Sequence, residues 1–328
     1  MSDLKKKILV AGGAGYIGSR LVPSLQEDGY DVTVIDLLWF GKNLPGGTHV
    51  IEKDIFNVTV EDLHGFDTVI FLGGLSNDPM AEFSPALNFI SNGGSPLHLA
   101  YIAKKAGVKK FIYGSSCSIY GYTDSDEVTE DFDANTQFPY GMSKLQGEIG
   151  VQQLADDTFS VISFRQGTLS GYSPRMRFDL FINTMYMKAV TAGTITVNNP
   201  AIWRPVLAIQ DAVIAYKKAV DADISISGVF NIASANKTVG EAAEEIRDYF
   251  KSTFGKSVTI EKKDIFDLRN YRVSTQKAKD VLGINLQSEV VTILDDLRDN
   301  VGLDYDFEAA KYYNIQVFER LPKTISIL

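Results

Sequence analysis

The amino-acid sequence predicts an α/β fold, in which a doubly wound parallel sheet is followed by a smaller C-terminal α/β lobe. Short apolar segments rich in β-branched residues alternate with helical patterns through the first half of the chain. These segments lack regular polar alternation, which is typical of parallel strands covered by helices on both faces. A glycine-rich turn, GGAGYIG, joins the first apolar segment to the first helical one.

Each element of the sheet is expected from its own pattern. Strands are predicted at residues 7–11, 31–36, 49–54, 66–72, 109–116 and 159–166. Helices are predicted at residues 16–29 and 85–106. Because right-handed crossovers join such units, the strands should run parallel. Further along, strands are expected at residues 228–234 and 258–264, and helical segments at 238–253 and 275–300.

The composition limits the classes of function. The chain has 328 residues and a net charge of −9, which argues against a general surface for nucleic acid or anionic membranes. A lone cysteine, Cys117, rules out an internal disulfide and fits a reducing compartment. No apolar stretch is long enough to span a membrane. We therefore expect a cytoplasmic protein with no metal site, no nucleic-acid partner and no membrane contact.

The glycine-rich turn satisfies two dinucleotide-binding patterns, G-x-G-x-x-G at Gly13, Gly15 and Gly18, and a looser one that begins at Gly12. Glycines there allow a tight turn, close approach to a pyrophosphate and packing of the helix on the sheet. A lone glycine pattern is weak evidence, and its alternative is a structural turn. Here the pattern lies between a strand and a helix, which favours dinucleotide binding.

An acid ends the second strand, as expected for a residue that binds the adenosine ribose. Asp36 follows Gly18 by 18 residues. A carboxylate would repel a 2′-phosphate, so Asp36 favours NAD over NADP, although Lys42 leaves NADP open. Asp54 ends the third strand and has two interpretations, a turn or helix cap and a contact on the adenine side of the cofactor.

The segment FPYGMSKLQGE places Tyr140 and Lys144 four residues apart on one predicted helix face. Such a pair is common by itself and usually has only a small effect on stability. A serine-rich strand end, FIYGSSCSIYG, lies between the glycine turn and this pair. This order of motifs makes the tyrosine and lysine candidates for an active site.

The chain resembles the extended short-chain dehydrogenase/reductases, in the group of nucleotide-sugar epimerases and dehydratases, which have a Rossmann-type fold. The matching segments occur in the family's order: AGGAGYIGSRLV, VIDLLWFG, KDI, FLGGLSNDP, FIYGSSCSIYG, YGMSK, FRQGTLSG and WRPVLAIQD. The resemblance implies catalytic roles for Ser116, Tyr140 and Lys144. Tyr140 would be the acid/base, Lys144 would hold the nicotinamide ribose and lower the pKa of the phenol, and Ser116 would bind the substrate hydroxyl. The alternative is a turn serine, a core tyrosine and a surface lysine.

The resemblance also implies the residues that bind the ligands. The cofactor residues would be Gly12, Gly15, Tyr16, Ile17, Gly18, Asp36, Asp54, Ile55, Leu72, Gly73, Gly74, Asn92, Tyr140 and Lys144. The Leu-Gly-Gly at 72–74 departs from the more usual Leu-Ala-Ala, and Asn92 could equally be a plain helix cap. The substrate residues would be Ser116, Thr168, Arg204 and Arg269. Arginines suit a diphosphate, and Arg175, Arg177 and Arg272 are further candidates. Surface salt bridges are the alternative for all of them.

The implied function is an NAD-dependent nucleotide-sugar epimerase, acting at C4 through a transient 4-keto sugar. A 4-ketoreductase that consumes NAD(P)H is the second interpretation. A 4,6-dehydratase is disfavoured, since Cys117 and Ser118 replace the Asp-Glu that such enzymes carry after the catalytic Ser/Thr. A non-catalytic dinucleotide-binding regulatory protein is the alternative from another class.

The resemblance divides the chain into two units. Residues 1–167 and 206–234 would form the NAD-binding domain, and residues 168–205 and 235–328 the substrate lobe. It further implies a homodimer, with the helix that starts at Tyr140 and the helix at 85–106 as candidate faces. The tail from Tyr305 onward lies outside the motifs and is free to pack on a partner subunit.

Overall fold

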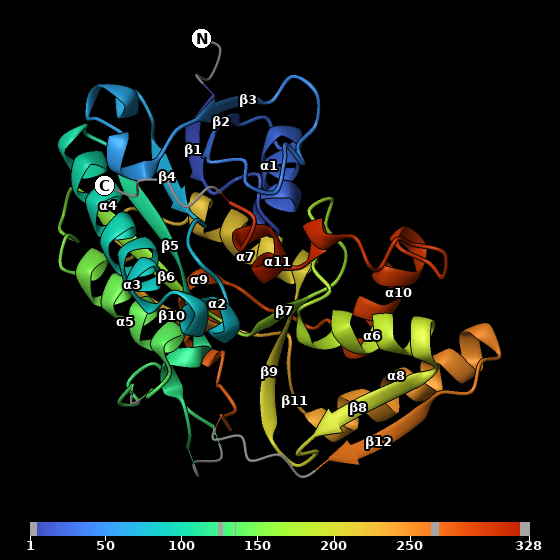
Figure 1. Ribbon diagram of the computed structural model, residues 1–328. Coiled ribbons are helices and arrows are strands. Elements are labelled where there is room, and N and C mark those ends of the chain that lie inside the picture. Colours follow the sequence, from blue (N-terminus) through green and yellow to red (C-terminus); the bar gives the residue numbers. More distant parts are fainter. Residues whose placement is uncertain (1–4, 124–126, 135, 264–268, 322–328) are drawn as a thin grey trace.

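The architecture is that of a large parallel sheet with helices on both faces, seen in a computed structural model that describes residues 5–123, 127–134, 136–263 and 269–321 (Figure 1). Seven strands of the described part of the chain pair in the order β10-β6-β5-β4-β1-β2-β3, and each neighbouring pair is parallel. The bounds are β1 (Lys7–Ala11), β2 (Asp31–Asp36), β3 (His49–Glu52), β4 (Thr68–Phe71), β5 (Lys110–Ser116), β6 (Ser160–Gln166) and β10 (Gly228–Ile232). The predicted fold class is confirmed. The strand order reverses between β1 and β4, where such sheets bind ligands at their carboxyl ends.

Helices cover the two faces of this sheet. On one face lie α1 (Gly18–Glu27), α7 (Ile209–Asp221) and α9 (Gln276–Leu282). On the other lie α4 (Ser95–Lys105) and α5 (Pro139–Gln152), beside α2 (Asp78–Phe83) and α3 (Pro85–Phe89). Alternate residues of β1 supply the two cores: Ile8 and Val10 face α1, whereas Leu9 and Ala11 face the α4 side. Both faces of the sheet are therefore buried under helices, as the apolar strand patterns indicate.

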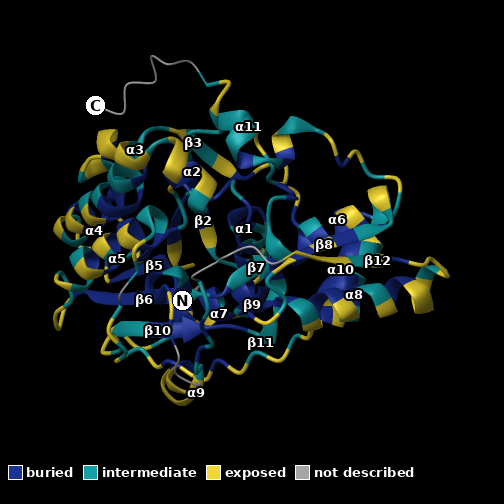
Figure 2. Ribbon diagram, turned by 60° about the horizontal axis from the view of Figure 1, so that its bottom comes forward, coloured by how far each residue is buried: buried dark blue, intermediate teal, exposed yellow. Residues whose placement is uncertain are grey.

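A smaller lobe holds a separate apolar core beside the carboxyl edge of the sheet (Figures 1 and 2). One small sheet has the order β11 (Ala235–Thr238), β9 (Trp203–Ala208), β7 (Thr168–Ser170). A second pairs β8 (Thr194–Asn198) with β12 (Thr259–Lys263). The helices of this region are α6 (Phe181–Ala192), α8 (Val239–Phe254) and α10 (Val290–Asn300), and a short helix, α11 (Asn314–Phe318), follows. In the part of the chain that the structure describes, no helix has the length and apolar character needed to cross a membrane.

The helix predicted as one element at 85–106 is instead interrupted. A π-helical turn at Ile90–Gly94 separates α3 from α4. Pro96 has no N–H to donate to the carbonyl of Asn92, one turn earlier. That carbonyl accepts the Tyr113 hydroxyl at 3.0 Å instead. The wider turn is closed by the Ser95 N–H, which donates to the Ile90 carbonyl.

One segment of the expected substrate lobe packs elsewhere. Helix α9 packs on the large sheet, beside β10.

The described part of the tail packs on the smaller lobe of its own subunit. Its Tyr305, Phe307 and Tyr312 rings surround Phe178, with centroid separations of 5.9, 5.0 and 5.6 Å. A contact of the tail with a partner subunit stays a prediction.

Candidate active site

The glycine turn brings the end of β1 against the loop that follows β4. Gly12 has a φ of +77°, and a Cβ there would lie 2.5 Å from the Gly73 nitrogen. A Cβ on Gly18 would lie 2.3 Å from the Gly13 carbonyl oxygen. Neither position has room for a larger residue, so the turn and the start of α1 require glycine. Glycine at position 73, where alanine is usual, lies at this closest approach.

Two neighbouring cavities open at the carboxyl edge of the sheet, of about 340 Å³ and about 150 Å³. They share the glycine turn and the segment 72–75 as walls. The smaller is lined by Asp36, Asp54 and Ile55. The larger is lined by Tyr16, Ile17, Asn92, Ser116, Tyr140, Lys144, Thr168, Arg204 and Arg269. Of the site residues predicted from the sequence, all but Gly13, Gly18 and the further candidate Arg272 therefore border one of these cavities.

Asp36 is held by the backbone at the smaller cavity. Its Oδ2 accepts the Ala14 N–H at 3.0 Å, and its Oδ1 accepts the Leu38 N–H at 2.8 Å. Burial raises the pKa of this carboxyl, although these N–H groups oppose the shift. Asp54 combines both of its interpretations: it accepts the Phe56 N–H at 2.9 Å as a cap, and it lines the same cavity.

Asn92 lies in the π-helical turn and is not a plain helix cap. Its amide nitrogen donates to the Leu75 carbonyl at 2.8 Å and to the Ser143 hydroxyl at 3.1 Å. Its Oδ1 is buried and has no hydrogen-bond partner in the described part of the chain. A Cβ on Gly74 would lie 2.1 Å from that oxygen, so glycine is required there too. An unsatisfied buried acceptor is costly, and one beside the cavity suits a ligand that donates to it.

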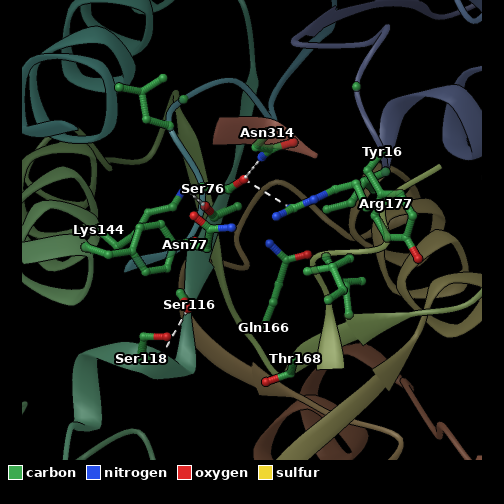
Figure 3. Close-up of a pocket in the computed structure, with 18 of the residues that line it drawn as sticks. Tyr16, Ser76, Asn77, Ser116, Ser118, Lys144, Gln166, Thr168, Arg177 and Asn314 are labelled. Carbon is green, nitrogen blue, oxygen red and sulfur yellow. Dashed lines mark hydrogen bonds between the residues drawn. The ribbon is translucent and has the colours of Figure 1, made fainter. Parts of the chain in front are cut away.

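Ser116, Tyr140 and Lys144 meet where β5 ends against the first turns of α5. The Ser116 side chain lies close enough to the Tyr140 phenol to lower its pKa, and its Oγ accepts the Ser118 N–H at 3.1 Å. Lys144 donates to the Gly114 carbonyl at 2.7 Å. Figure 3 shows Ser116 and Lys144 on one side of the cavity, opposite Tyr16 and Arg177.

The structure separates Ser116 from its neighbour Ser115. The Ser115 hydroxyl donates to Glu148 at 2.6 Å. Glu148 also forms a buried salt bridge with Arg165, at 2.7 Å. The Ser115 hydroxyl is therefore part of a structural network beneath the strand end, and of these two serines Ser116 is the one whose side chain affects the Tyr140 phenol.

Burial sets the protonation of the pair on α5. It raises the pKa of Tyr140 to about 12, against an opposing effect of the Ser116 side chain. It lowers the pKa of Lys144 to about 8. Burial thus favours the neutral form of both side chains. The lowering of the phenol pKa by Lys144 stays a prediction.

The predicted substrate arginines lie together at the far end of the larger cavity. A guanidinium N–H of Arg204 donates to the Arg269 carbonyl, and Arg269 pairs with Asp78. Thr168 begins β7 and faces the same cavity (Figure 3). Arg269 thus fits both interpretations, because it forms a salt bridge with Asp78 and also lines the larger cavity.

The lining residues that were not expected from the sequence include Ser76, Gln166 and Asn314. Gln166 ends β6, and the rule that ligands bind at the carboxyl ends of strands could have identified it. Ser76 and Asn314 are 238 residues apart and share a hydrogen bond of 2.7 Å, a contact that no local pattern indicates.

Comparison with known proteins agrees with this geometry. A sequence model of the NAD dependent epimerase/dehydratase family matches residues 8–254, well over half of the chain. The chain belongs to that family.

Similar members of the family include UDP-glucose 4-epimerases. That of Azospirillum brasilense is 31% identical over 148 residues, 43% of this chain and 42% of its own. That of Bacillus subtilis is 29% identical over 191 residues, 52% and 55% of the two chains. The chain thus spans about half the length of the curated relatives that it matches. Among solved structures, the UDP-glucose 4-epimerase of Brucella ovis in complex with NAD has a TM-score of 0.80 and 21% identity, covering 90% and 98% of the two chains. DesIV, a dTDP-glucose 4,6-dehydratase of Streptomyces venezuelae, has a TM-score of 0.78 and 21% identity, covering 92% and 99%.

Family membership confirms NAD as the predicted cofactor. The residues at the crevice fit it, with glycines at the closest backbone approach and an acid at the end of β2. The Cys117 thiol donates to the Arg165 carbonyl and burial raises its pKa, so it supplies no acid or base.

Proposed function

We propose that the protein is an NAD-dependent nucleotide-sugar epimerase that acts at C4 through a transient 4-keto sugar. One observation carries this proposal: Ser116, Tyr140 and Lys144 line one cavity, and that cavity shares its walls with the dinucleotide crevice. That arrangement would place a sugar carbon between an acid/base and a hydride acceptor.

In this mechanism Tyr140 takes the proton from the C4 hydroxyl, and Ser116 holds that hydroxyl through a hydrogen bond. NAD, which the glycine turn and Asp36 would hold, would supply the hydride acceptor for C4 and the hydride donor for the keto sugar. Tyr140 then returns its proton to the sugar oxygen. Because Tyr140 is protonated at neutral pH when ligands are absent, its activation requires added positive charge near the phenol. The Lys144 ammonium is the nearest candidate on α5.

A dehydration is not proposed, because water elimination needs an acid and a base beside the reacting carbon. Cys117 is buried and bonded to a backbone carbonyl, and Ser118 offers only a hydroxyl. Asp36 likewise favours NAD over the phosphorylated cofactor that an NADPH-dependent reductase would consume.

We propose the same division of labour between the two units of the chain as the sequence predicts. Residues 1–167 and 206–234 hold the cofactor, while residues 168–205 and 235–328 contribute Thr168, Arg204 and Arg269 to the nucleotide-sugar side. Arginine suits the substrate diphosphate through charge and paired donors. Arg269 would exchange its partner Asp78 for phosphate oxygens on binding.

We further propose a homodimer that pairs α4 and α5 with the same helices of a second copy. Leu97 and Tyr101 on α4, and Met142 and Ile149 on α5, are apolar and exposed (Figure 2). A Cβ on Gly150 would lie 3.3 Å from Leu97, so the exposed faces of the two helices adjoin. Apolar side chains gathered on neighbouring helices favour such an interface.

The test is incubation of the purified protein with UDP-, dTDP-, CDP- and GDP-sugars, with NMR of the sugar and nicotinamide absorbance followed together. An epimer formed without net change in NADH is the expected result. Net oxidation or reduction of the nicotinamide would instead favour the 4-ketoreductase. NAD binding without any sugar product would favour a regulatory role.

A further inference from the structure

The C-terminal helix α11 reaches the larger cavity from outside the region that matches the family. Asn314, its first residue, is 6% exposed and lines the cavity. Its amide nitrogen donates to the Ser76 hydroxyl at 2.7 Å, and Ser76 in turn accepts from Arg177 at 3.0 Å (Figure 3). The Asn314 backbone N–H donates to Asp179 at 3.4 Å. Through its side chain and its backbone, Asn314 thus links the tail to the loop after β4 and to the segment 175–179.

Asn314 also orients a buried arginine. Its Oδ1 accepts a hydrogen bond from the Arg175 guanidinium, which lies 3.8 Å from the centre of the Phe40 ring. Arg175 is 3% exposed and lines the larger cavity together with Gly15 and Tyr16 of the glycine turn. Its guanidinium therefore has little freedom to turn away from the crevice.

Arg175 has no carboxylate in direct contact within the described residues. Arg177 forms a salt bridge with Asp179 at 2.9 Å, whereas Arg175 interacts with Asp179 and Asp36 only at longer range. Burial, with Arg177 nearby, lowers the pKa of Arg175 to about 9. A buried cation without a counterion is costly, and an anion at this place would offset the cost. The anion that a glycine turn and the start of the following helix would hold here is the diphosphate of the dinucleotide.

The other end of α11 touches the wall of the smaller cavity. The Phe318 ring lies 5.9 Å from Trp39 and 5.8 Å from Phe83, between ring centres. Trp39 lines the smaller cavity beside Asp36. The helix thus connects the diphosphate side of the crevice with its adenosine side.

We propose that Asn314 is a positioning residue of the cofactor site, which directs Arg175 to the NAD diphosphate and, with Phe318, retains the cofactor in its crevice. This inference rests on the dinucleotide site of the proposed function and adds to it a C-terminal element. A retained cofactor suits a reaction that restores it at each turnover.

The test measures NAD release, without any sugar nucleotide. The full-length protein and its variants are loaded with NAD, desalted, and mixed with an external NAD-consuming dehydrogenase that reports free cofactor. Asn314→Ala should release NAD about tenfold faster than the wild type, the scale of one hydrogen bond to a charged group. Phe318→Ala should also release it faster. Asn300→Ala, an exposed asparagine on α10, should stay within about twofold of the wild type.

A double-mutant cycle distinguishes the positioning of Arg175 by Asn314 from a general destabilisation of the cofactor site. In an Arg175→Gln background, Asn314→Ala should change the release rate by less than about twofold, because its partner is already absent. Release from Asn314→Ala as slow as from Asn300→Ala would overturn the inference, as would a full additional effect in the Arg175→Gln background. Asn314→Ser replaces Asn314→Ala if the latter does not fold. Failure of the sugar assay would leave this measurement intact, whereas failure of the loaded wild type to hold NAD would overturn both proposals.

Discussion

Tyr140 and Lys144 lie one turn apart on α5, and burial moves their pKa values in opposite directions. Both shifts favour the neutral form of the side chain, because each group has lost its contact with water. Ionising either side chain therefore costs more free energy in the folded protein than in water. Tyr140 and Lys144 each lead to a prediction.

Tyr140→Phe should lower kcat by at least about a hundredfold, since it removes the proposed acid/base. NAD affinity should change little, because the ring is kept. Steady-state kinetics and NAD titration would measure the two effects. Tyr101→Phe, at an exposed tyrosine on α4, is the matched control. Turnover that survives in Tyr140→Phe would remove Tyr140 from its proposed role.

Lys144→Met should stabilise the cofactor-free protein at neutral pH. The folded pKa of about 8 lies below the ordinary lysine value of about 10.4, so the folded state disfavours the ammonium. The cost is fully present below pH 8 and disappears as the pH rises toward the unfolded pKa. We expect the variant to gain up to about 3 kcal/mol at pH 7 and much less near pH 10. Urea unfolding at the two pH values measures this, and an equal gain at both would contradict the explanation.

At the scale of elements, the interrupted helix and α5 are in unusually close contact. A Cβ on Gly147 would lie 2.2 Å from the Asn92 carbonyl oxygen and 2.6 Å from the Tyr113 hydroxyl. These are the two groups that hydrogen bond each other at the π-helical turn. The approach of α5 to this turn therefore depends on glycine.

Gly147→Ala should destabilise the protein by roughly 2–4 kcal/mol, because the contacting atoms are a backbone carbonyl and a hydrogen-bonded hydroxyl. Gly150→Ala, three residues later in the same helix, meets only the flexible Leu97 side chain at 3.3 Å. It should be neutral within about 1 kcal/mol, since alanine favours helix. Thermal unfolding of both variants makes the comparison, and similar losses in the two would refute the close-contact argument.

The sequence predicted the elements whose signals are local. The apolar runs located the strands within a few residues, and the glycine turn with Asp36 and the Tyr140–Lys144 pair located the crevice. The break in the helix at 85–106 was missed, although Pro96 carries its cause, because a proline near a helix start is ordinary. Asn314 could not be found, since its partners Ser76 and Arg175 are distant in the sequence and become neighbours only through folding.

At the scale of the whole molecule, the chain passes more than once between the large sheet and the smaller lobe. It enters the lobe at β7, returns for α7 and β10, and leaves again at β11. The cavity residues consequently come from every part of the sequence, from Gly12 to Asn314. A ligand at this position would contact both units at once.

Ile149→Glu should convert the proposed homodimer to a monomer, because a charge at the centre of an apolar interface is strongly unfavourable. Size-exclusion chromatography with light scattering measures the mass directly. Val281→Glu, at a similarly exposed apolar residue on α9, should leave the mass unchanged. A wild-type chain that elutes as a monomer at every concentration would remove the dimer proposal.

The two oxygens of Asp36 are already engaged by the backbone N–H groups of Ala14 and Leu38. The carboxylate that we propose to select the cofactor therefore also shapes the glycine turn beside it. A designer who replaced it with a small neutral residue, to admit a 2′-phosphate, would also loosen that turn. A change of coenzyme preference in this scaffold would need a second substitution, to supply new acceptors for those two backbone groups.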